Sequence, residues 1–122
     1  MMRKTAATIL LLATIESIAT EPPLPISSGT YELGLRFAEH PTIISTTRFV
    51  ATINGYEIIV KNEGRTDVHP SGLIVEGTLM WHASSQQWII GQTDADRHAS
   101  DVGGCGGGPP VVDLIKLEYW DC

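Results

Sequence analysis

Basic residues are scarce in this chain of 122 residues: 8 Lys and Arg stand against 14 Asp and Glu, and the formal net charge is −6. Proteins that bind nucleic acid usually gather Lys and Arg on one face, where these side chains contact the phosphates. Anionic membrane surfaces attract basic segments for the same electrostatic reason. We therefore expect neither nucleic acid nor an anionic membrane surface as a partner.

Motifs that identify a reaction or a bound cofactor are also missing. The glycine-rich run 103–108 lacks the Gly-Lys-Ser/Thr ending of a phosphate-binding loop, so its glycines are better explained by a loop that needs backbone freedom. No spacing typical of zinc ligands groups the four histidines, which are His40, His69, His82 and His98. We expect no cofactor, and we expect the protein not to be an enzyme.

Cysteine occurs only twice, at Cys105 and Cys122, and the chain contains no C-x-x-C pair. Two lone thiols in an oxidising compartment usually form one disulfide. A redox-active or metal-binding pair is the alternative, but no histidine stands beside either cysteine. We predict a structural disulfide that ties the glycine-rich run to Cys122.

The first nineteen residues have the composition of an export signal. Arg3 and Lys4 precede an apolar run at 5–15, and Ser17 and Ala19 supply small residues at −3 and −1 of a cleavage point after Ala19. The apolar run is shorter than the roughly 20 residues that span a bilayer, so a retained anchor is the weaker interpretation. We predict a signal peptide at 1–19, no membrane anchor after its cleavage, and a periplasmic or secreted protein.

Removal of residues 1–19 leaves 6 basic and 13 acidic residues, so the mature chain is more acidic than the whole, with a net charge of −7. Residues 20–28 contain Pro22, Pro23 and Pro25, which fix φ and remove backbone donors, so we expect an extended tether there. Residues 29–122 are long enough for one domain with a single core.

Alternation of apolar and polar residues in 30–37 predicts the first β-strand of this domain. Asn54-Gly55 predicts a two-residue hairpin turn, in which Ile53 opposes Tyr56 and Ala51 opposes Ile58. A second hairpin around Ser84-Ser85 pairs Trp81 with Trp88.

The residues 111–120 alternate again and complete a set of six predicted strands, with no convincing helical period in the mature chain. We therefore predict an all-β domain, built as a small antiparallel meander that closes fully or partly into a six-stranded barrel. A β-sandwich is the alternative. The barrel is preferred because closure removes exposed strand edges.

Candidate ligands are densest in an acidic segment within the predicted loop 93–110. Oxygen donors at alternating positions resemble the start of a calcium loop, but glycine and glutamate are absent from the sixth and twelfth positions. An irregular calcium site and a solvated acidic loop are the two interpretations, and we predict no metal. The candidate binding residues are Asp94, Asp96, His98, Asp101 and Trp120.

Aromatic residues suggest a further surface. Trp81 and Trp88 fit a barrel core better than an exposed platform, whereas Trp120 fits either. The leading hypothesis is an exported, non-enzymatic binding module, of the inhibitor or immunity type, that engages a protein through loops 63–71 and 93–110.

Two other hypotheses remain. The first is a barrel that carries a small apolar ligand in a cavity behind Tyr31, Phe49, Ile58 and Trp81. The second is a small metal-dependent hydrolase centred on His82, His98 and Asp96.

The protein recovered from its exported compartment should begin at Thr20 and carry Cys105 and Cys122 as one disulfide. N-terminal sequencing and mass spectrometry of a non-reduced digest measure these two features. An N-terminus at Met1 would contradict the export signal, and two free thiols would contradict the disulfide.

Overall fold

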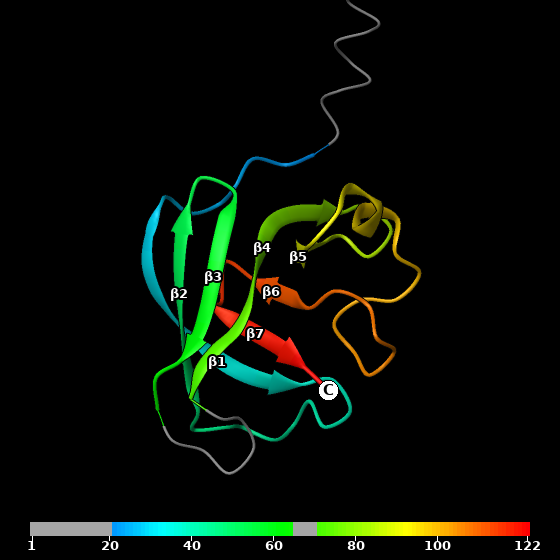
Figure 1. Ribbon diagram of the computed structural model, residues 1–122. Helices are drawn as coiled ribbons and strands as arrows, with labels where there is room; N and C mark the ends of the chain where they lie inside the picture. Colours follow the sequence, from blue (N-terminus) through cyan, green and yellow to red (C-terminus); the bar gives the residue numbers. More distant parts are fainter. Residues whose placement is uncertain (1–20, 65–70) are drawn as a thin grey trace, which may run out of the picture.

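A computed structural model describes residues 21–64 and 71–122, and Figure 1 shows that they form a single sheet that closes on itself. The predicted signal peptide 1–19 and most of the predicted binding loop 63–71 lie outside the described residues. The strands follow the chain around the ring in the order β1 (Gly29–Phe37), β2 (Arg48–Asn54), β3 (Glu57–Asn62), β4 (Gly72–His82), β5 (Gln87–Gly91), β6 (Val111–Asp113) and β7 (Glu118–Asp121). The all-β, ring-closing prediction is therefore confirmed.

Helix is almost absent from the described part of the chain. A short 3₁₀ helix, η1 (Asp94–His98), lies between β5 and β6. Across residues 21–64 and 71–122, no helix has the length and apolar character needed to cross a membrane.

The alternation of apolar residues along β1, β2 and β3 points one face of each strand into the ring. Phe49, Ala51 and Val60 are fully buried there. They belong to one core cluster, whose other buried members are Leu33, Leu35, Ile53, Ile58, Leu79, Trp88, Ile90, Val112, Leu114 and Tyr119. A smaller cluster of Met80, Ile89 and Val111 packs against Val102 and Trp120.

The hairpin between β2 and β3 forms at the predicted place but with a different register. Ile53 pairs with Ile58 and Asn54 with Glu57, so the turn is Gly55-Tyr56 and the predicted Ile53–Tyr56 pairing is wrong by two residues. Of the two turn residues, only Gly55 has a positive φ, of 61°, which fits a type II′ turn with glycine at its first central position. A shift of two residues preserves the face of every side chain, so the predicted core residues of β2 stay inside.

The hairpin between β4 and β5 matches its prediction. Trp81 pairs with Trp88 and Leu79 with Ile90, around the turn 83–86.

The predicted strand 111–120 is instead two strands, β6 and β7, joined by a turn, so the barrel has seven strands rather than six. The side-chain Oδ1 of Asp113 accepts the backbone N–H groups of Ile115 at 3.0 Å and Lys116 at 2.8 Å. Asp side chains often accept nearby backbone N–H groups in this way, and these hydrogen bonds compete with strand pairing. It reverses the chain and leaves Ile115 82% exposed, against the predicted alternation.

The additional strand determines how the ring closes. Consecutive strands of a meander alternate in direction, so an odd number leaves the first and last strands pointing the same way. β1 and β7 accordingly pair in parallel through four residue pairs, while the other six neighbouring pairs are antiparallel. We call this β1/β7 pairing the seam.

Side chains from both strands reinforce the seam. Arg36 donates to Glu118 at 2.9 Å and lies 5.2 Å from the ring centroid of Trp120, a cation–π contact. On the inner side, the rings of Tyr119 and Phe49 meet edge to face at 5.4 Å. Burial, with a smaller contribution from the charge of Asp121, raises the pKa of Tyr119 to about 12, so its phenol stays neutral well above neutral pH.

The predicted disulfide between Cys105 and Cys122 is present, with a Cα–Cα distance of 4.8 Å. It lies just beyond the seam, where the backbone N–H of Ala38 donates to the carbonyl of Asp121 at 2.8 Å. The glycine-rich run approaches the backbone of Asp101 so closely that a Cβ on Gly108 would collide with the carbonyl of Asp101. A disulfide of this kind suits an oxidising, exported compartment.

Replacing both cysteines with serine should destabilise the domain. The disulfide joins residues 17 apart, and closing a loop of this size contributes about 3 kcal/mol to the free energy of unfolding. The melting temperature should fall by roughly 12–24 °C, as measured by circular dichroism. Reduced wild-type protein should show the same fall, and a loss of less than a few degrees in both samples would contradict a stabilising role.

Candidate binding groove

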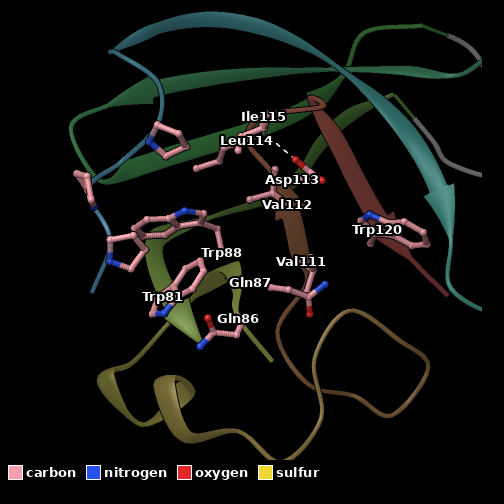
Figure 2. Close-up of a pocket in the computed structure, with 13 residues that line it drawn as sticks. Trp81, Gln86, Gln87, Trp88, Val111, Val112, Asp113, Leu114, Ile115 and Trp120 are labelled. Carbon is pink, nitrogen blue, oxygen red and sulfur yellow. Dashed lines mark hydrogen bonds between the residues drawn. The ribbon is translucent and has the colours of Figure 1, made fainter. Parts of the chain in front are cut away.

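An apolar groove of about 320 Å³ opens in the barrel wall beside β5 and β6 (Figure 2). The register between these strands consists of one pair, Ile89 with Val111, whereas β4 and β5 share five. The tryptophan groove, as we call it, is lined by Pro22, Pro23, Pro25, Trp81, Gln86, Gln87, Trp88, Val111, Val112, Asp113, Leu114, Ile115 and Trp120.

Two indoles from the β4–β5 hairpin form one wall. Trp81 and Trp88 meet edge to face, with ring centroids 5.4 Å apart and an interplanar angle of 66°. Trp88 is 7% exposed and belongs to the core, while Trp81 is half-buried and packs against it. The pair therefore serves the core on one side and the groove on the other.

The segment 21–28, which we call the strap, contributes Pro22, Pro23 and Pro25 to the lining of the groove. Pro22, Leu24 and Ile26 are half-buried and alternate with exposed residues, as expected for an extended chain. Leu24 and Ile26 pack against the main core, so the segment predicted as a tether also covers part of the barrel.

Glu21 holds the start of the strap. Its Oε1 accepts a hydrogen bond from Arg97 at 2.8 Å and one from the backbone N–H of Trp81 at 3.4 Å. Hydrogen bonds to Asp94 and then to Glu21 raise the pKa of Arg97, so its charge is permanent. The strap is thus fixed to both β4 and η1.

The turn after β6 completes the rim. The hydrogen bonds accepted by Asp113 hold Ile115 at the edge of the groove, as Figure 2 shows. Trp120 lies on another part of the rim, backed by Arg36. The lining residues include one carboxylate, that of Asp113, and no basic side chain.

Of the five predicted binding residues, only Trp120 lines this groove. Asp94 is exposed and pairs with Arg97 at 3.0 Å. Asp96 caps η1 by accepting the backbone N–H of Thr93 at 3.3 Å, and it also accepts that of Gln92 at 2.7 Å. His98 and Asp101 are exposed, and Asp101 lines a separate polar hollow. The acidic residues therefore organise their own loop, and their predicted binding role stays a prediction.

His82, one of the four histidines that no ligand spacing groups in the sequence, is only 3% exposed. Its Nε2 lies 2.7 Å from the carbonyl of Ala99, and its Nδ1 lies 2.7 Å from the hydroxyl of Ser85. Because a carbonyl only accepts, Nε2 carries the proton. The ring joins the β4–β5 turn to the segment after η1.

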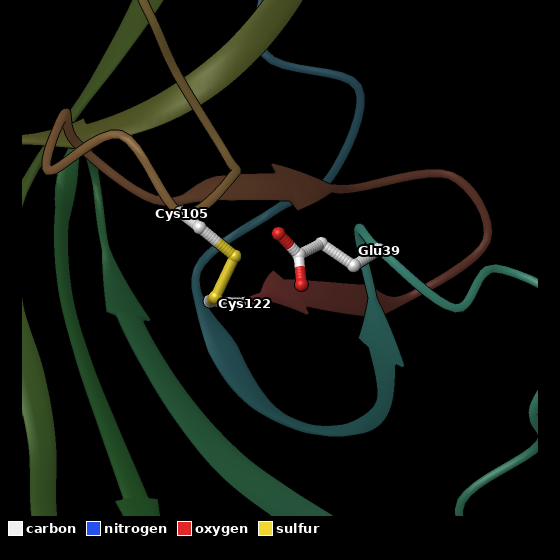
Figure 3. Close-up of side chains that lie close together, drawn as sticks. All are labelled: Glu39, Cys105 and Cys122. Atoms are coloured by element: carbon white, nitrogen blue, oxygen red, sulfur yellow. A yellow bond between two sulfur atoms is a disulfide. The ribbon is translucent and has the colours of Figure 1, made fainter.

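A metal-dependent hydrolase finds little support in the geometry. Within the described residues, one group of three possible ligands has its ligand atoms within 4.8 Å of one another: Glu39, Cys105 and Cys122 (Figure 3). Its two sulfurs are already bonded to each other. The proposed set of His82, His98 and Asp96 forms no such group.

No protein-family model, curated protein or solved structure matches this chain. The interpretation of the groove therefore rests on its own geometry.

Substituting His82 with alanine should lower the free energy of unfolding by roughly 2–4 kcal/mol. The substitution removes a buried ring and leaves the partly buried carbonyl of Ala99 without its donor. The exposed His40 is the matched control, and H40A should change stability by less than about 0.5 kcal/mol. Urea denaturation measures both; equal stability of the two variants would contradict the structural role of His82.

Proposed function

We propose that this protein is an exported, non-enzymatic binding module that engages a protein partner, with inhibitor or immunity-type proteins as the closest functional class. The observation that carries this proposal is the tryptophan groove: an open, apolar, aromatic surface on a barrel that contains a disulfide. The predicted loop 93–110 lies beside it, because Val111 begins β6 in the groove wall.

Rigid aromatic and aliphatic anchors are the usual centres of protein interfaces. Trp81 and Trp120 are half-buried and Ile115 is almost fully exposed, so all three offer apolar area at the groove. Their positions are fixed by strands or by a hydrogen-bonded turn, which lowers the entropy lost on binding. These properties favour a preformed interface over a catalytic pocket.

A carrier of a small apolar ligand is the second candidate, favoured by the volume of the groove. About 320 Å³ lies at the lower end of the roughly 300–1,000 Å³ typical of ligand pockets. The position differs from the predicted cavity, however, because Phe49 and Ile58 are buried in the packed core. Such a ligand would lie in the wall of the barrel rather than behind these residues.

The test compares two exposed isoleucines. Ile115 lines the groove at 82% exposure, and Ile44 is 83% exposed and is not among the lining residues. A partner captured by the mature chain from the exported fraction should bind I115S roughly tenfold more weakly than wild type, because a groove anchor is lost. Isothermal titration calorimetry should show I44S within about twofold of wild type.

Equal binding by the two variants would contradict the groove as the interface. An exported protein that retains a small apolar molecule in native mass spectrometry, and captures no protein, would favour the carrier instead. Both substitutions are on exposed side chains, so the fold should survive either of them.

A further inference from the structure

The groove offers an unusual set of hydrogen-bond donors. Trp81, Trp88 and Trp120 all line it, and none of their indole N–H groups makes a hydrogen bond within the described residues. The one fully buried side-chain nitrogen or oxygen without a partner there is Nε of Arg36, so none of the three indole nitrogens is fully buried. An indole N–H donates and never accepts. The groove therefore suits a ligand that is rich in acceptors.

A side-chain amide, that of Gln87, also lines the groove. Gln87 is exposed and its side chain makes no hydrogen bond in the described structure, whereas the amide of Gln86 donates to the carbonyl of Ala83 at 2.8 Å. Gln87 also lines a neighbouring hollow of about 230 Å³, together with Val111 and Trp120. The two spaces share three lining residues and therefore adjoin, and we call them together the track.

The strap is an example of a segment that lies against this groove. Pro22, Pro23 and Pro25 line the same groove as the two paired indoles. Proline-rich segments form the polyproline II helix, whose carbonyls are not bonded internally and whose prolines lack N–H groups. Such a segment is rich in acceptors and poor in donors, which matches the indoles.

The charge of the groove favours some proline-rich segments over others. The groove carries the carboxylate of Asp113 and no basic side chain, and the mature chain has 13 acidic residues against 6 basic. An acidic segment would be repelled, and a basic one attracted.

From these observations we propose that the open part of the tryptophan groove binds an extended, proline-rich segment of a partner protein that carries a Lys or Arg beside its prolines. The proposal rests on the proposed function and names the chemistry of its partner. The segment lies along the track in the polyproline II conformation, the mode in which aromatic grooves recognise proline. Its carbonyls accept from the indole N–H groups, and Gln87 contacts its backbone.

The experiment uses three synthetic peptides of equal length: one with the core Pro-Pro-Leu-Pro flanked by two arginines, one with every proline replaced by alanine, and one with glutamates in place of the arginines. Binding is followed by two-dimensional NMR of the mature chain, in which each tryptophan gives a separate indole N–H signal. The first peptide should shift the indole signals downfield, and the other two should bind roughly tenfold more weakly, equivalent to about 1.4 kcal/mol.

Two variants test the site of binding. W120F keeps an aromatic ring but removes one donor, and I115S leaves all three indoles in place. Each substitution should lower the affinity for the proline peptide roughly fivefold to tenfold. I44S is the matched control and should bind as wild type does. Retained binding by I115S, or equal binding of the alanine and proline peptides, would overturn the proposal.

The failures of the two proposals are distinguishable. A captured partner whose binding depends on Ile115 but which contains no such segment would overturn the proline inference and leave the binding module intact. If the exported protein holds only a small apolar molecule and binds no peptide or protein, both proposals are overturned.

Discussion

The parallel pairing of β1 with β7 is the interaction on which the barrel depends, because it alone converts a seven-stranded meander into a ring. Parallel pairs are slightly less stable per residue than antiparallel pairs, and this seam is four pairs long. Arg36 bridges it on one face and Tyr119 packs against Phe49 on the other. The disulfide then prevents the last residues from separating from the glycine-rich loop.

One side chain links this seam to the groove. The turn that Asp113 caps divides the last predicted strand, which makes the strand number odd and the closing pair parallel. The same turn places Leu114 and Ile115 in the lining of the groove. The closure of the ring and the candidate binding surface thus share the turn at Asp113.

The sequence predicts the features that depend on a local pattern, and it misses those in which a turn competes with a strand or with another turn. Alternation and turn residues were sufficient for the all-β class and the pairing of Trp81 with Trp88, and the presence of just two cysteines was sufficient for the disulfide. The division at Asp113 was hidden because apolar residues at 111, 115 and 117 continue the period of two; the Asp side chain, which caps a turn, was the available signal. Where two turns compete, as at Asn54-Gly55, pattern alone leaves a two-residue ambiguity because both registers bury the same face.

The candidate site was predicted least well because its parts are distant in sequence. Glu21 and Arg97 are 76 residues apart, and nothing local to either indicates that they meet. Trp81 and Trp88 were assigned to the core, which is correct for their packing, yet the opening of the β5/β6 wall also gives them a solvent-facing role. The predicted cleavage point precedes Glu21 by one residue, Thr20, so export would leave the whole strap on the mature chain. Cleavage at that point would therefore keep the prolines of the strap on the same chain as the indoles with which they line the groove.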